Sequence, residues 1–195
     1  MKEIVDAGTI GEIRAVWETG AGRRPSQIEP LFDELARRKI NTVYYRMQGG
    51  GNSHVQSADN LLAPRLSDML PPAARHGIAL HAWVTCWSVD EVAAETRATL
   101  AAGGRLMRDA QGNDLPWLCP SHPENQRLVL AGIASLASNG VHGIHLGYIR
   151  YPEQGCYAAA TRAAFERFQG EAAGDWPRAV LPGGASAEAF QTFRR

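Results

Sequence analysis

The sequence predicts an α/β protein built from parallel β/α repeats. Short runs rich in β-branched and aromatic residues alternate with segments whose apolar residues recur at helical spacing. The predicted strands are 12–19, 40–48, 78–87 and 141–147. The predicted helices start near 26, 67, 90, 122 and 158. Such alternation indicates parallel strands joined by right-handed crossovers.

The third predicted strand, IALHAWVTCW, has the clearest alternation. Its side chains separate into two sets, because successive residues of a strand point to opposite faces. His81, Trp83, Thr85 and Trp87 form one set, and Leu80, Ala82 and Val84 form the other. If the third and fourth strands alternate in this way, we expect His81 and His145 to face the barrel interior.

Capping signals predict where several helices begin. Ser26 with Glu29, and Ser121 with Glu124, have the spacing of a capping box. Asp90 is a candidate cap for the helix that follows the third strand.

The remaining segments are predicted to be loops or short elements. Residues 52–67 form a polar loop long enough to bind a ligand. Residues 49–51 are three glycines that lack the spacing of a phosphate-binding loop, so they are interpreted as a turn. Residues 105–120 show no periodicity and are interpreted as a turn-rich excursion, and Ser186 is expected to open a last short helix.

The number of strands predicts a partial barrel. A complete eight-stranded β/α barrel takes about 250 residues, whereas this chain has 195 residues and four clear strands. We therefore expect one domain, 1–195, with about four βα units of a truncated TIM-type barrel. An open sheet of this kind leaves two edges and an inner face uncovered. We expect the chain to self-associate or to be part of a longer barrel.

The composition argues against several classes of partner. The chain is 45% hydrophobic and 21% charged, and its 20 basic residues balance its 20 acidic residues. We expect neither a nucleic-acid nor a membrane partner. The three cysteines are scattered and fit neither a disulfide framework nor a zinc spacing, and Cys86 is expected to be a buried hydrophobe. No signal peptide is visible, so a cytoplasmic location is the default expectation.

The stretch VHGIHLGYIRYP, from Val141 to Pro152, is the first place to look for ligand chemistry. Its apolar start, between two helical segments, is typical of a buried parallel strand. Its end gathers Tyr148, Arg150 and Tyr151. Binding sites of α/β proteins form at the carboxyl ends of their strands.

Five segments in order resemble the glycosyl hydrolase-like barrels, also called family-10-like glycosylhydrolases. They are EIRAVWETGAG, INTVYYRMQGGG, ALHAWVTCW, WLCPSHPENQRLVL and GIHLGYIRYP. The resemblance implies a TIM-type barrel that acts on a polysaccharide or glycan. The fourth strand of the family is similar to DGIHLDYIRYP, and His142 and Gly147 stand at its two aspartate positions. Related α-amylase-like barrels place their nucleophile at the second of these positions. Because Gly147 stands there in this chain, the resemblance implies that its nucleophile position is impaired.

The candidate catalytic residues are Glu18 and Glu153, because glycoside hydrolysis uses two carboxylates that flank the scissile bond. Aromatic, imidazole and guanidinium groups are the candidates for substrate binding. They are Arg46, His81, His145, Tyr148, Arg150 and Tyr151. An ion pair with Glu18 is the alternative for Arg46. Zinc binding is the alternative for His81, His145 and Glu18, although no HxxxH spacing supports it, and no cofactor is expected.

Three functions remain open from the sequence. The leading hypothesis is a glycoside hydrolase with an impaired fourth strand. The second is a non-catalytic carbohydrate-binding relic of the same fold. The third is a sugar-phosphate enzyme that uses Arg46 and a helix N-terminus to bind phosphate.

Overall fold

The computed structural model describes residues 11–19, 23–47, 66–90, 92–153 and 155–195. Its residues pack into two compact units. The first unit comprises residues 11–19, 23–47, 66–84 and 135–145, and the second comprises the other described residues. The predicted turn at 49–51 and the predicted loop up to residue 65 lie outside the described residues.

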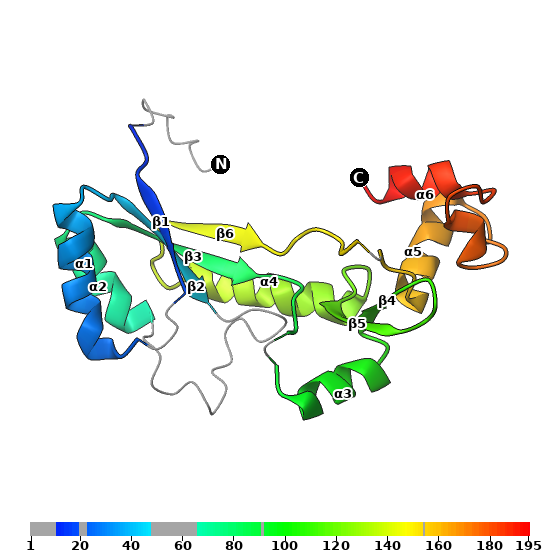
Figure 1. Ribbon diagram of the computed structural model, residues 1–195, viewed down its shortest axis with the longest axis horizontal. Coiled ribbons are helices and arrows are strands. Elements are labelled where there is room, and N and C mark those ends of the chain that lie inside the picture. The colour runs from blue at the N-terminus through cyan, green and yellow to red at the C-terminus, as the bar shows by residue number, and fades with distance from the viewer. Residues whose placement is uncertain (1–10, 20–22, 48–65, 91, 154) are drawn as a thin grey trace. The chain divides into compact units, whose positions relative to one another are not determined.

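The first unit is built on a four-stranded sheet (Figure 1). Its strands, in spatial order, are β1 (Ala15–Glu18), β2 (Thr42–Met47), β3 (Ala79–Thr85) and β6 (Gly143–Gly147). β1 pairs parallel with β2, and β2 pairs parallel with β3. Helices alternate with the strands along the chain, so the predicted α/β fold with parallel repeats is confirmed.

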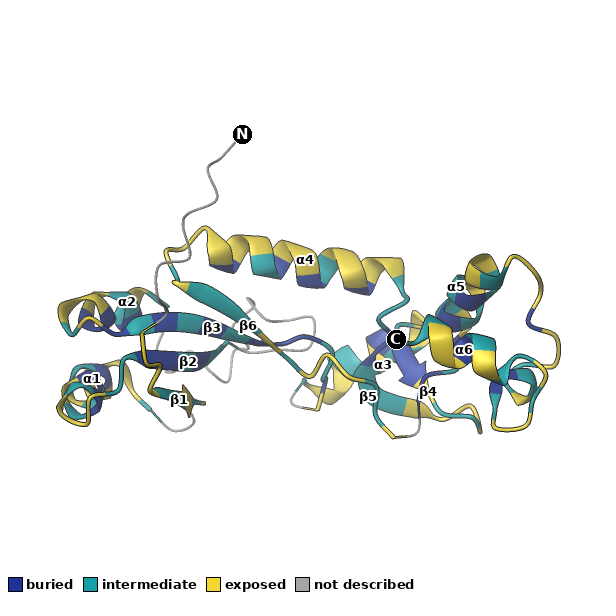
Figure 2. Ribbon diagram, turned by 90° about the horizontal axis from the view of Figure 1, so that it is seen from above, coloured by how far each residue is buried: buried dark blue, intermediate teal, exposed yellow. Residues whose placement is uncertain are grey.

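Two helices cover one face of this sheet: α1 (Ile28–Arg37) and α2 (Leu66–Arg75). Phe32 of α1 and Met69 of α2 pack with Val43 of β2 and Leu80 of β3, and all four side chains are fully buried. Figure 2 shows the buried positions that run along β2 and β3. Along β3, Leu80, Ala82 and Val84 are buried and the residues between them are half-buried, which is the predicted alternation.

The predicted capping boxes are wrong. A 3-10 turn, η1 (Pro25–Gln27), precedes α1, and the side chain of Gln27 accepts a hydrogen bond from the Arg24 backbone N–H at 2.8 Å. Glu29 forms an ion pair with Arg75 instead. The second signal fails in the same way, because Glu124 pairs with Arg127, one turn along its own helix, at 2.6 Å. In both cases, an arginine forms an ion pair with the glutamate that was expected to cap the helix.

The second unit contains an antiparallel hairpin where a turn-rich excursion was predicted. Its strands are β4 (Leu106–Arg108) and β5 (Asp114–Leu118). The Asp109 carboxylate closes the turn by accepting the backbone N–H groups of Gln111 at 2.9 Å and Asn113 at 2.8 Å. The preceding helix, α3 (Ala94–Ala102), begins four residues after Asp90, so the predicted Asp90 cap is also wrong.

The remaining helices follow the sequence prediction closely. They are α4 (Pro123–Ala137), α5 (Ala159–Gln169) and α6 (Ala187–Phe193), with a 3-10 turn, η3 (Arg178–Val180), before the last. Ser186 is the residue that precedes α6, as predicted. Phe165 of α5 and Phe190 of α6 are fully buried, and their ring centroids are 5.1 Å apart. In the described part of the chain, no helix has the length and apolar character needed to span a membrane.

We predict that Phe32→Ala lowers the free energy of unfolding by about 3–5 kcal/mol, because truncating a buried aromatic side chain removes its packing and leaves a cavity. Arg37→Ala, on the exposed side of the same helix, should change it by no more than about 0.5 kcal/mol. Chemical denaturation followed by circular dichroism measures both variants. Equal effects of the two substitutions would contradict the described core.

Candidate functional site

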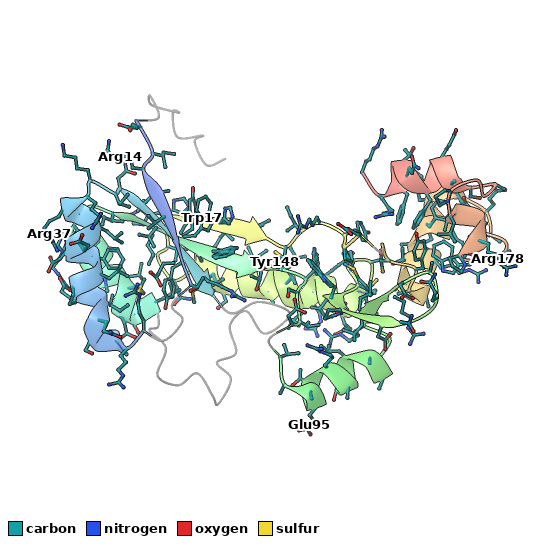
Figure 3. All side chains as sticks on the ribbon, in the orientation of Figure 1. Arg14, Trp17, Arg37, Glu95, Tyr148 and Arg178 are labelled. Carbon is teal, nitrogen blue, oxygen red and sulfur yellow. The ribbon has the colours of Figure 1, made fainter. Side chains whose placement is uncertain are left out.

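The sheet face opposite α1 and α2 carries a row of rings. Trp17, Tyr44 and His81 are register partners on β1, β2 and β3, so they project from the same face. His145 of β6 completes the row. These four residues are called the ring row below, and Figure 3 labels Trp17 at its β1 end.

The members of the ring row contact one another. Tyr44 stacks on Trp17 with ring centroids 5.0 Å apart and an interplanar angle of 27°. Its ring also lies 5.2 Å from the His81 ring and 4.8 Å from the His145 ring. Tyr44 is therefore the centre of the row.

The ring contacts show that this face is concave. β1 and β6 are the two edges of the sheet, separated by three strand spacings. In a flat sheet that separation would be about 14 Å. The Trp17 and His145 ring centroids are nevertheless only 5.9 Å apart. The edge strands therefore direct their side chains inward, as strands do on the inside of a barrel.

Two further side chains extend this face toward the carboxyl ends of the strands. Arg46 and Trp83 are register partners, and the Arg46 guanidinium carbon lies 5.9 Å from the centre of the Trp83 ring. Trp83 also lies 6.4 Å from His145, edge to face. The Trp83 indole N–H is buried and meets no acceptor among the described residues. An unsatisfied buried donor costs about 1–3 kcal/mol, so the Trp83 N–H carries such a cost in the described structure.

His81 is held neutral at the middle of the face. Burial lowers its pKa from 6.5, and the nearby imidazoles of His142 and His145 lower it further. A neutral imidazole offers one hydrogen-bond donor and one acceptor. Gly143 makes room for it, because a Cβ at that position would lie 2.5 Å from His81 Nδ1.

Glu18, a predicted catalytic residue, belongs to the other face of the sheet. It is the register partner of the buried Tyr45 and follows Trp17 directly, so the pleat points it away from the ring row. Its carboxylate accepts a hydrogen bond from Arg23 at 2.8 Å. Burial raises the pKa of Tyr45 to about 12, and the negative charge of Glu18 adds to this shift. The described ion pair of Glu18 is thus with Arg23, and Arg46 contacts Trp83.

The other predicted site residues lie in the second unit. Tyr148 is 42% exposed, has a left-handed backbone (φ 54°) and places its ring 5.6 Å from Trp117. Tyr151 is half-buried, and the Arg194 guanidinium covers its ring at 4.6 Å. Arg150 and Glu153 are exposed. The structure brings Arg46, His81 and His145 together in the first unit, and the roles of the other residues stay predictions.

Neither residue at the family's aspartate positions supplies a carboxylate. The His142 backbone N–H donates to the Leu80 carbonyl at 2.8 Å, and its Nδ1 accepts the Leu80 N–H at 3.2 Å. His142 is thereby fixed to the backbone of β3. The Gly147 carbonyl accepts the N–H of Cys86 at 2.9 Å. These positions contribute to the backbone network of the strands.

One group of potential metal ligands lies between α1 and α2. The ligand atoms of Glu29, Asp33 and His76 lie within 4.8 Å of one another. Arg75 is also paired with Glu29, and its hydrogen bond lowers the pKa of that carboxyl group. We interpret the group as a surface ion-pair network that ties the two helices together.

Trp17 and Tyr44 were not predicted as site residues. For Tyr44 the signal was present, because alternation in INTVYYRMQ places it on the same face as Arg46. Trp17 lies in a run of only four strand residues, and its partners come from other strands. Only the strand pairing shows that it belongs to this face.

No family model matches the chain, and no curated protein matches it. Among solved structures it is similar to a β-galactosidase from Marinomonas ef1 (TM-score 0.63, 13% identity, 94% of this chain and 28% of that chain). It is similar to a GH20 exo-β-N-acetylglucosaminidase from Vibrio harveyi (TM-score 0.55, 14% identity, 94% of this chain and 34% of that chain). It also matches a hypothetical protein from Ruminiclostridium thermocellum (TM-score 0.54, 17% identity, 72% of this chain and 80% of that chain).

These similarities define the class of fold. The chain has a glycosidase-like α/β fold, a partial barrel of parallel β/α repeats. It spans about a third or less of the length of the two glycosidases. At such low identity the likeness concerns the fold alone.

We predict that Gly143→Ala lowers the free energy of unfolding by about 1–3 kcal/mol, the usual cost of overpacking. The new methyl group would collide with His81, whose ring is confined by Tyr44. Gly11→Ala is the matched control, since a Cβ there meets nothing within 4 Å. Denaturant titration of both variants measures the difference, and an unchanged Gly143→Ala would refute the close approach of His81.

Proposed function

We propose that the chain is a carbohydrate-binding protein of the glycosyl hydrolase-like type, and that its concave ring face binds a glycan. The observation that carries this proposal is the ring row, with Trp17 57% exposed and stacked on Tyr44. The face of a sugar ring that bears C–H bonds is apolar, and an exposed aromatic ring suits it.

The polar groups around the row suit the hydroxyl groups of a sugar. His81 in its neutral form can donate one hydrogen bond and accept another. The indole N–H of Trp83 is a hydrogen-bond donor that has no acceptor among the described residues. The guanidinium of Arg46 adds fixed donors close to Trp83. A flat apolar surface with a few directed polar groups is the usual composition of a ligand site.

Hydrolysis is the second candidate function. It is favoured by the resemblance to family-10-like glycosylhydrolases, whereas Glu18 at the carboxyl end of β1 lies on the face opposite the ring row. Glycoside hydrolysis requires two carboxyl groups on either side of the bond. In the described strands, the positions on the ring-row face hold no aspartate or glutamate. We therefore place binding ahead of turnover.

Trp17→Ala tests the proposed binding. Aromatic pairing contributes about 0.5–1.5 kcal/mol, so the dissociation constant should rise up to about tenfold. Isothermal titration with short gluco-, galacto- and N-acetylglucosamine oligosaccharides provides the measurement. Phe168→Ala is the matched control, because Phe168 is 54% exposed on α5 and is not a member of the ring row. Binding that is absent, or equally weakened in both variants, would contradict the proposal.

Gly147→Asp tests whether the fold retains hydrolytic capacity. The substitution restores the carboxylate that the family resemblance places at the end of β6. We expect the chain to bind oligosaccharides without cleaving them, and the Gly147→Asp variant to release reducing ends slowly if Glu153 acts as the second carboxyl group. Reducing-sugar assays with Glu153→Gln in the same background test that group, and Glu18→Gln, on the face opposite the ring row, is the control. Turnover by the unsubstituted chain would instead make hydrolysis its function.

A further inference from the structure

The structure brings two of the three cysteines together in the second unit. The Sγ atoms of Cys119 and Cys156 are 3.8 Å apart, although the residues are 37 positions apart in the chain. Cys119 directly follows β5, and Cys156 lies three residues before α5. Both are free thiols with no exposed surface, in a cluster with Met107. No spacing of the cysteines in the chain indicates this proximity.

A hydroxyl group lies against both sulfur atoms. Thr161 Oγ1, from the first turn of α5, is 3.1 Å from the sulfur of Cys156 and 3.3 Å from that of Cys119. The Thr161 side chain is itself fully buried. Two thiols and a hydroxyl group therefore form a closed polar cluster inside an apolar core.

The cluster makes the two cysteines unequal. The hydrogen bond between the two sulfur atoms, followed by those with Thr161 and the backbone of Ala158 and Arg108, lowers the pKa of Cys156. Burial opposes this shift. The same hydrogen bond and burial raise the pKa of Cys119. The Cys156 thiol is thus the more acidic of the two, and the more acidic thiol of a pair loses its proton first.

We propose that Cys119 and Cys156 form a redox site, which a peroxide oxidises to an intramolecular disulfide. Cys86 takes no part, since it is buried outside this cluster. The geometry carries the proposal: two buried thiols in contact, with a shared hydroxyl group and no metal ligand beside them among the described residues.

The chemistry is balanced in two steps. The Cys156 thiolate attacks one oxygen of hydrogen peroxide, the O–O bond breaks, and the products are Cys156 sulfenic acid and hydroxide. The Cys119 sulfur then attacks the Cys156 sulfur and displaces the hydroxyl group, which leaves as water with the Cys119 proton. Two electrons pass from the two sulfur atoms to the peroxide. A dithiol reductant reverses the reaction by thiol–disulfide exchange.

The disulfide would tie the end of β5 to the start of α5. An S–S bond is about 2.05 Å long, so the sulfur atoms must approach from contact distance by rotation of the side chains. Half-buried Tyr151 packs against the same cluster. A link across 37 positions restricts the unfolded chain and stabilises the fold.

Peptide mapping of the full chain tests the proposal. The reduced protein is treated with hydrogen peroxide, denatured, and alkylated before proteolysis and mass spectrometry. We expect two of the three cysteines to escape alkylation, a peptide pair that joins Cys119 to Cys156, and full recovery of alkylation after dithiothreitol. We also expect the oxidised chain to unfold at a higher temperature than the reduced chain.

Single substitutions separate this inference from general oxidation. Cys86→Ser should form the same disulfide, whereas Cys119→Ser should retain a Cys156 sulfenic acid that dimedone labels, and Cys156→Ser should give no label at Cys119. If the variants fail to fold, mapping of the unsubstituted chain decides alone. Links that involve Cys86, links between chains, or three alkylated cysteines after peroxide treatment would each overturn the inference.

Discussion

The alternation of side chains along β2 and β3 is the constraint on which the rest of the first unit depends. Val43 and Leu80 point to one side, where Phe32 and Met69 exclude water. The residues between them must then point to the other side. A shift of one residue in either strand would exchange the two faces. The hydrophobic core thus determines which rings are presented together, although none of those rings belongs to it.

As a result of this alternation, the ring row consists of chemically similar side chains. Its members are aromatic or imidazole groups, and the nearby charge is the guanidinium of Arg46. Such a surface favours apolar contact and neutral hydrogen bonds over acid–base chemistry. The residues at the family's two aspartate positions fit this picture, because His142 is fixed to the β3 backbone and Gly147 has no side chain. A glycosidase-like fold is here combined with an aromatic sheet face.

The fold was largely predictable because its signals are local. Alternation identified the sheet strands, and Ser186 marked the last helix. The hairpin of β4 and β5 was missed because its strands are short and Pro116 interrupts the pattern. The site was less predictable, since the contacts of Trp17 and the proximity of Cys119 and Cys156 arise from distant parts of the chain.

Tyr148, directly after β6, has a backbone conformation that glycine would adopt more easily. Its left-handed backbone costs a residue with a Cβ about 1–2 kcal/mol, and glycine would avoid most of that penalty. The chain nevertheless keeps a phenol there, with its ring against Trp117. The tyrosine thus strains the backbone at this position, and the packing of its ring against Trp117 offsets part of that strain.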